Sequence, residues 1–275
     1  MIEKVTSPQT PPVEETSAVM REVLEAWNAA RPASRLAKSA ELLYGPALFG
    51  HVAHVHRLAE GVLTLYDTGQ ALTAMTLVRQ MIETSIRAVW LSVYRENLYH
   101  LVRDGERQRK NAFEAAAQTG QIPKNAPALV RALDWLTENE RVKGATNGES
   151  FKDLCDELEG GDLVYAQYRL ASNYTHPGSF LLEEYFTAEE AEGNKVSLTF
   201  VTKPDLPARE AWLCLAAFTL LLAGLTWDHA DKTHRHRALL RRHAAAYGVP
   251  TREFEMTPAG FAKWNAAQKA SSRRR

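Results

Sequence analysis

Apolar residues recur every three or four positions along most of the chain, which is the spacing of one face of an α-helix. The clearest case opens on Gly45-Pro46 and ends at the turn Asp67-Thr68-Gly69. Proline is tolerated in the first turn of a helix, so it fits this start. The segment therefore predicts an amphipathic helix of about twenty residues. Its periodic positions are Leu48, Val52, Val55, Leu58, Val62 and Leu65.

The same spacing predicts helices along the rest of the chain. A first helix is expected from Thr16 or Ser17 to Pro32, because a hydroxyl side chain caps a helix start and proline halts it. The longest helical pattern, from 70 to 117, has a candidate break at Asp104-Gly105. A single helix of about forty residues is expected from 205 until Gly248, which suits a helix end. Shorter helices are predicted over 34–43, 128–139 and 151–158, with another beginning at 160–162.

Beyond Pro177-Gly178 the helical spacing gives way to alternation. The segments F-L-L-E-E-Y-F and K-V-S-L-T-F-V are rich in aromatic and β-branched residues, with A-E-E-A-E-G-N between them. This pattern predicts a small β-hairpin inserted between helices. The fold class is therefore all-α, a helical bundle with a small inserted β-hairpin. We expect a disordered leader over 1–16, one helical domain over 17–250 and a weakly structured basic tail over 251–275.

The segment from Ala211 to Trp227 contains no charged residue, which raises the question of a membrane span. Crossing a bilayer takes about 20 apolar residues. This run is shorter, includes two threonines and a glycine, and is flanked at once by charged residues. A helix that is apolar all round belongs either in a protein core or in a membrane. The sequence favours a buried core helix and no membrane contact, with a membrane-anchored form as the alternative.

Charge is balanced over the whole chain but uneven along it. The 33 basic residues equal the 33 acidic ones, so no overall field attracts nucleic acid. The stretch from Lys232 to His243 contains no acid, however, and the chain ends in three arginines. We expect this stretch to follow an RNA backbone; the alternative is a solvated helix end, where cations are favoured anyway. The predicted RNA-binding residues are Arg235, Arg237, Arg241 and Arg242.

The cysteines and the N-terminal segment both bear on the cellular compartment. Cys155 and Cys214 lie far apart beside apolar, helix-favouring residues, which suits reduced thiols. The N-terminus has prolines and acids where a secretory signal needs a basic start and an apolar run. These features predict a cytoplasmic protein.

Three histidines, His51, His54 and His56, suggest a metal site at first sight. Only His51 and His54 share a helix face, and no Glu-x-x-His partner is present to complete a dimetal site. We expect no metal and no cofactor. The Walker loop, GxGxxG, GxSxG and HExxH motifs are also absent from the sequence.

The stretch Y-R-L-A-S-N-Y-T-H-P-G-S, residues 168–179, is the strongest candidate for chemistry. From 163 to 182 the only charged side chain besides His176 is Arg169, whereas a plain solvent-facing stripe usually carries Lys and Glu. Such a stripe favours a cleft or an interface. On a helix, one stripe would hold Tyr165, Tyr168, Arg169, Ser172 and His176.

Arg169 and His176 together suit a phosphate. Arginine is a permanently charged fork that holds phosphate oxygens, and histidine exchanges protons near neutral pH. Because the residue before a proline avoids the helical region, His176 is expected just past the helix end. The alternative is that both side chains cap carbonyls or pair with acids of a neighbouring helix.

The string R-L-A-S-N-Y-T-H resembles the R-x(4–6)-H motif of HEPN domains, all-helical bundles found in prokaryotic toxins and antiphage effectors. The wider pattern Y-x-x-Y-R-x-x-S-x-x-x-H-P, with the upstream segment R-Q-M-I-E-T-S-I-R-A-V-W-L at 79–91, also resembles a group of uncharacterised bacterial proteins. The resemblance covers about residues 45–180.

The resemblance implies a metal-independent endoribonuclease in which two motifs meet across a homodimer cleft. Arg169 would stabilise the phosphorane-like transition state, and His176 would act as general base or acid. Active members often have a polar residue directly after the arginine, where this chain has Leu170; Ser172 or Asn173 would substitute for it. Many relatives with altered motifs only bind. The second hypothesis is therefore a non-catalytic helical binding protein, an antitoxin-like or regulatory module that uses the same stripe to hold a nucleotide or a partner such as an antitoxin or regulatory protein.

An upstream charged ladder is the remaining candidate. Arg79, Glu83 and Arg87 are spaced four apart, which makes a local ion-pair series on one helix. The alternative is that Glu83, beside apolar Ile86 and Trp90, is partly buried and braces Arg169 or His176 from behind.

Overall fold

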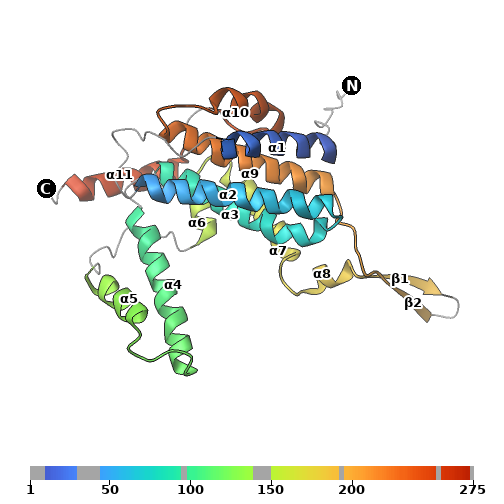
Figure 1. Cartoon of the computed structure of the whole chain (residues 1–275), viewed down its shortest axis with the longest axis horizontal. Coiled ribbons are helices and arrows are strands. Elements are labelled where there is room, and N and C mark those ends of the chain that lie inside the picture. The colour runs from blue at the N-terminus through green and yellow to red at the C-terminus, as the bar shows by residue number, and fades with distance from the viewer. Residues whose placement is uncertain are drawn as a thin grey trace. The chain divides into compact units, whose positions relative to one another are not determined.

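The computed structural model describes residues 10–29, 44–93, 98–138, 150–191, 195–251 and 255–272. These residues form helices and one two-stranded antiparallel sheet (Figure 1), which confirms the prediction of an all-α fold with a small inserted hairpin. The helices are α1 Val13–Ala29, α2 Tyr44–Asp67, α3 Ala71–Val93, α4 Leu98–Gln118, α5 Pro127–Glu138, α6 Phe151–Asp156, α7 Gly161–Asn173, α8 Ser179–Glu183, α9 Arg209–Ala230, α10 Arg237–Ala244 and α11 Pro258–Ser272. The strands are β1 Phe186–Ala191 and β2 Lys195–Phe200.

The chain divides into two compact units. The first comprises residues 1–89 and 163–254, and the second comprises residues 90–162 and 255–275. In the first unit α9 packs against α1, α2 and α10. In the second, α4 packs against α5. The predicted domain bounds of 17–250 stay a prediction.

The apolar helix α9 lies in the core of the first unit. It is long and apolar enough to cross a membrane, yet 72% of its most apolar 18-residue segment is buried inside the protein. Fifteen of its residues are buried, among them Leu213, Leu220 and Leu225 at 0% exposure. Burial of this kind is what a core helix provides, because a helix that is apolar all round needs neighbours on every side.

The start of the first helix and the predicted break at Asp104-Gly105 differ from the structure. The first helix begins at Val13, so Thr16 and Ser17 lie inside it as buried residues, and residues 13–16 of the predicted leader are helical. Asp104 and Gly105 lie within α4, so the helix is not broken there. The predicted helix 34–43 lies outside the described residues.

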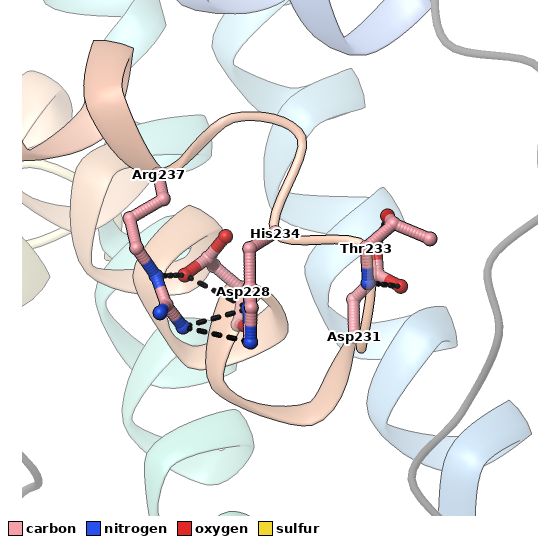
Figure 2. Close-up of polar contacts among 5 residues, drawn as sticks. All are labelled: Asp228, Asp231, Thr233, His234 and Arg237. Atoms are coloured by element: carbon pink, nitrogen blue, oxygen red, sulfur yellow. Dashed lines mark hydrogen bonds and ion pairs between the residues drawn. The ribbon is translucent and has the colours of Figure 1, made fainter.

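The predicted forty-residue helix is instead two helices, α9 and α10, separated by a turn at 231–236. Figure 2 shows the contacts that make this turn. The Asp231 carboxylate accepts hydrogen bonds from the Thr233 backbone N–H and hydroxyl at 3.1 and 2.6 Å. His234 adopts a left-handed conformation, φ 47°, and its Nδ1 donates to the Asp228 carbonyl at 2.7 Å. Aspartate and threonine side chains compete with the helix for backbone groups in this way.

The hairpin is present, but its first strand begins later than predicted. β1 pairs with β2 in the register Phe186 with Phe200 and Ala191 with Lys195. The apolar stretch F-L-L-E belongs to α8, and the acidic segment expected as a connection forms part of β1. Pairing across a short connection selects the residues nearest the turn, whatever their polarity.

The C-terminal segment, predicted as a weakly structured tail, contains α11. Proline at its first position is favourable. In the second unit the preceding residues attach to the end of α6: Leu158 and Met256 form a β-bridge, and the Thr257 N–H donates to the Glu157 carbonyl at 3.1 Å. Lys263 forms an ion pair with Glu157, whose other carboxylate oxygen accepts a 2.9 Å hydrogen bond from the Trp90 indole.

Candidate functional site

The candidate motif lies on α7, and two glycines set where that helix begins. Gly160 has φ 74°, a left-handed conformation that favours glycine. At Gly161 a Cβ would stand 1.9 Å from the Cys155 carbonyl oxygen, so the chain passes too close for any side chain. The predicted helix start at 160–162 is therefore confirmed, and its cause is steric.

Arg79 of α3 holds the middle of α7. Its Nε donates to the Ser172 hydroxyl at 3.0 Å, and its Nη2 donates to the Tyr168 hydroxyl. The guanidinium also lies over the Tyr168 ring, 4.6 Å from the ring centroid. The Ser172 hydroxyl in turn donates to the Tyr168 carbonyl at 2.8 Å. One arginine therefore fixes two residues one helical turn apart.

Glu83 and Arg87 form one rung of the predicted ladder. Arg87 Nη2 lies 3.0 Å from Glu83 Oε1, and both side chains are about one-fifth exposed, at 19% and 21%. Arg79 does not continue the series among the described residues, because its guanidinium donates to Ser172 and Tyr168 of α7. Burial, and then the nearby charge of Glu83, raise the pKa of Tyr168. Glu83 thus borders the Arg79 contact rather than Arg169 or His176.

Arg169 and His176 are both exposed. Neither side chain has a hydrogen bond or ion pair within the part of the chain that the structure describes. α7 ends at Asn173, and the His176 N–H donates to the Ser172 carbonyl at 3.2 Å. His176 therefore lies in the turn just past the helix, as the following proline predicted. Capping by these two side chains is not seen.

The other residues of the predicted stripe have different surroundings. Tyr165 stacks with Tyr168 at 6.2 Å between ring centroids and is half-buried. Asn173 is exposed at the helix end. Leu170, directly after Arg169, is 54% exposed, and Leu182 of α8 is 56% exposed. The exposed side of the motif is consequently part cationic and part apolar.

The four predicted RNA-binding arginines do not form one free row. Arg237 is bound to Asp228, with Nε 2.7 Å from Oδ2, and Arg242 pairs with Glu22 of α1. Arg241 and Arg235 are exposed. Two of the four guanidiniums therefore have acidic partners within the first unit, as the solvated-helix alternative would allow.

Two of the three histidines of α2 donate hydrogen bonds to backbone carbonyls of their own helix. His51 Nδ1 donates to the Ala47 carbonyl and His56 Nδ1 to the Val52 carbonyl, both at 2.8 Å. Across the described residues, no group of three or more His, Cys, Asp or Glu side chains is placed to hold a metal ion. Cys155 and Cys214 are not joined in a disulfide.

One group escaped the sequence reasoning altogether. A pocket in the first unit is lined by Trp27 of α1, His56 of α2 and Asp228 of α9, with further residues from the α9–α10 turn. These residues come from three separate stretches of chain, so no motif or spacing could reveal them. The signals in the sequence were two isolated tryptophans and an acid at the end of an apolar run.

The fold and the site thus define an all-helical protein whose candidate motif lies on α7 and is held by Arg79 of α3. The family model that matches residues 46–194 is described as a family of unknown function, DUF5677, and it spans more than half of the chain. The protein therefore belongs to that family. The matched segment runs from α2 into the hairpin, so it contains Arg79, Arg169 and His176 but not α9 to α11. Neither the curated proteins nor the solved structures contain a significant match.

Proposed function

We propose that the protein is a HEPN-like, metal-independent endoribonuclease that acts in the cytoplasm as a toxin or antiphage effector. The observation that carries the proposal is the state of Arg169 and His176: both are exposed and have no side-chain partner among the described residues. An exposed arginine and an exposed histidine seven residues apart in the sequence suit an anionic substrate. The sequence motif and this exposure point the same way.

In the proposed reaction the ribose 2′-hydroxyl attacks the adjacent phosphorus, and the 5′-oxygen leaves with a proton. His176 takes the proton from the 2′-hydroxyl or gives one to the leaving oxygen. Arg169 holds the non-bridging oxygens as negative charge builds on them. No metal ion is needed for either role.

The contact between α3 and α7 supports this assignment by fixing the helix that carries the motif. Arg79 binds Tyr168 and Ser172, which flank Arg169 in sequence. A positioned arginine loses less conformational entropy when it binds phosphate. Arg79 is thus proposed as a positioning residue, and Glu83 supports it from the same helix.

A homodimer is part of the proposal, because each copy of the motif supplies one histidine, His176, and the reaction uses both a base and an acid. Exposed Leu170 and Leu182 provide apolar surface near the motif that a second copy would cover. Light scattering on the purified chain at several concentrations measures this. A monomer throughout the range would contradict the dimer.

The test of catalysis is incubation with total RNA in EDTA, beside the variants Arg169→Ala and His176→Ala. We expect cleavage by the parent, cyclic phosphate or 3′-phosphate ends, and a loss of at least a hundredfold in each variant, in line with the usual size of acid–base contributions. Matched controls are His54→Ala and Arg131→Ala, which remove an exposed histidine and an exposed arginine elsewhere. Equal cleavage by all five proteins would assign the activity to a contaminant.

The second candidate is a non-catalytic helical binding protein with an antitoxin or regulatory partner. The exposed apolar residues of α8 and the hairpin favour it: Phe180 is 43% exposed, Leu182 56% and Phe200 76%. Apolar side chains gathered on one segment are typical of protein–protein contacts. A folded parent that leaves RNA intact in EDTA, with and without Mg²⁺, would favour this candidate over the first.

A further inference from the structure

The pocket of the first unit lies apart from α7 and carries a different chemistry. Its walls are largely aromatic and apolar, with Trp27 stacked on His56 at 4.0 Å between ring centroids. Polar groups enter from the end of α9 and the turn after it. The lining residues that matter here are Trp27, His56, Trp227, Asp228, Arg235 and His236.

Asp228 contributes a hydrogen-bond acceptor without a donor. Its side chain is 3% exposed, and Oδ2 is held by Arg237 Nε at 2.7 Å. Figure 2 shows Arg237 and His234 gathered around this carboxylate. Oδ1 is buried and has no hydrogen-bond partner among the described residues. A buried acceptor left in this state destabilises the fold, so a donor that reaches it binds favourably.

His56 contributes a second acceptor. A carbonyl oxygen only accepts, so the 2.8 Å contact with Val52 requires the proton to be on Nδ1, which leaves the Nε2 lone pair available. Complete burial lowers the pKa of His56 to about 4, so the ring is neutral at neutral pH. Two residues that line the pocket beside its aromatic rings, Asp228 and His56, therefore each carry an acceptor atom: a carboxylate oxygen and an imidazole nitrogen.

Size and charge restrict what enters. The enclosed space admits about one water-sized group, which is the size of an amino group. Asp228 is neutralised by Arg237, and Asp231 and Arg235 carry opposite charges at the same pocket. A neutral aromatic amine therefore fits this formally neutral site better than an ammonium ion does.

We propose that this pocket binds the amino group of a ligand, which donates hydrogen bonds to Asp228 Oδ1 and His56 Nε2 while the rest of the ligand stays at the mouth beside Arg235 and His236. The favoured source is the exocyclic amine of a nucleobase, whose ring would lie against the mouth. An aliphatic amine shares the donor chemistry and is the second source. The inference does not require the ribonuclease proposal, because binding is measured without cleavage.

The test uses pairs of probes that differ by one amino group. Guanosine and inosine form one pair, adenosine and purine riboside the other, and methylammonium chloride represents aliphatic amines against sodium chloride at equal ionic strength. The full chain is titrated by calorimetry or by NMR of its tryptophan indoles. We expect saturable binding of the amino member of at least one pair, at least tenfold tighter than the member without the amine.

Two variants locate the binding. Leu239→Trp obstructs the pocket, which Leu239 lines, and keeps the Asp228 and Arg237 side chains, whereas Asp228→Asn removes the carboxylate. Both are checked for native circular dichroism; if Asp228→Asn fails to fold, Leu239→Trp decides. We expect each folded variant to weaken binding at least tenfold and His54→Gln, outside the pocket, to leave it unchanged.

The outcomes separate cleanly. If methylammonium binds in preference to sodium and no nucleoside binds, the pocket is still a site for an amino group, and its ligand is an aliphatic amine. Equal binding of both members of each pair, no saturable binding of any probe, or unchanged binding in Leu239→Trp overturns the proposal. Loss of RNA cleavage in other experiments affects none of these readings.

Discussion

Replacing Arg79 with alanine should loosen α7 by a predictable amount. The substitution removes two hydrogen bonds, to Ser172 at 3.0 Å and to the Tyr168 hydroxyl, each worth about 1 kcal/mol in a half-buried setting. It also removes the cation–π contact at 4.6 Å, worth about 0.5–1 kcal/mol. The expected loss is therefore roughly 2–3 kcal/mol of unfolding free energy. Urea denaturation followed by circular dichroism measures it.

A double-mutant cycle makes the test specific. Tyr168→Phe removes one of the two hydrogen bonds and should cost about 1 kcal/mol alone, but less when Arg79 is already alanine. Arg57→Ala is the control, because Arg57 is 76% exposed and its pair with Glu60 is worth only about 0.3 kcal/mol. If Arg79→Ala and Arg57→Ala cost the same, or the cycle shows no coupling, Arg79 does not hold α7 and the reasoning is wrong.

Three further perturbations follow from other parts of the structure. Gly224→Ala places a Cβ 2.8 Å from a methyl carbon of Leu240, so we expect a loss of about 1–3 kcal/mol and a lower midpoint in thermal unfolding. His56 has a folded pKa of about 4 against an ordinary 6.5, so the unfolded chain binds the extra proton and stability falls as pH drops from 6.5 to 4, by up to about 3 kcal/mol. Urea titrations of the parent and His56→Gln over this range should converge as the pH falls. Lys263→Ala leaves the buried Glu157 without its cation, and limited proteolysis should then release α11 sooner.

Each of these has its own comparison. For the glycine, Gly50→Ala adds a methyl group that meets nothing within 4 Å and should be close to neutral or stabilising. For the histidine, a parent and a variant that lose stability in parallel would assign the pH effect to other groups. For the lysine, Lys110→Ala breaks a more exposed pair with Glu114, and equal release of α11 by both would contradict the role of Glu157.

Periodicity predicted most helices, because a helix that buries one face has apolar residues every three or four positions. α2 and α5 lie within a residue or two of their expected bounds, and the apolar run predicted α9 as a core helix. The predicted forty-residue helix failed for a different reason. The division of α9 from α10 depends on side-chain contacts of Asp231 and His234 with the backbone, which compete with an otherwise helical pattern.

In the candidate site, too, local features could be predicted from the sequence and contacts between distant segments could not. The position of His176 past the helix end followed from Pro177, a local effect on the preceding residue. The partnership of Arg79 with Tyr168 and Ser172 joins residues about ninety positions apart, and the local spacing of Arg79 with Glu83 suggested a different partner. Contacts between distant segments leave no periodic signal, so the pocket around Asp228 was also beyond sequence reasoning.

Side-chain contacts join the end of α9 to the turn that follows it and to the start of α10. Asp228 of α9 holds Arg237 of α10 through its carboxylate and His234 through its carbonyl. The last turn of α9 and the first turn of α10 should consequently open to solvent as one cooperative unit. Their amide protons would then exchange with deuterium at a common rate, and Arg237→Ala would release α10 to exchange faster on its own.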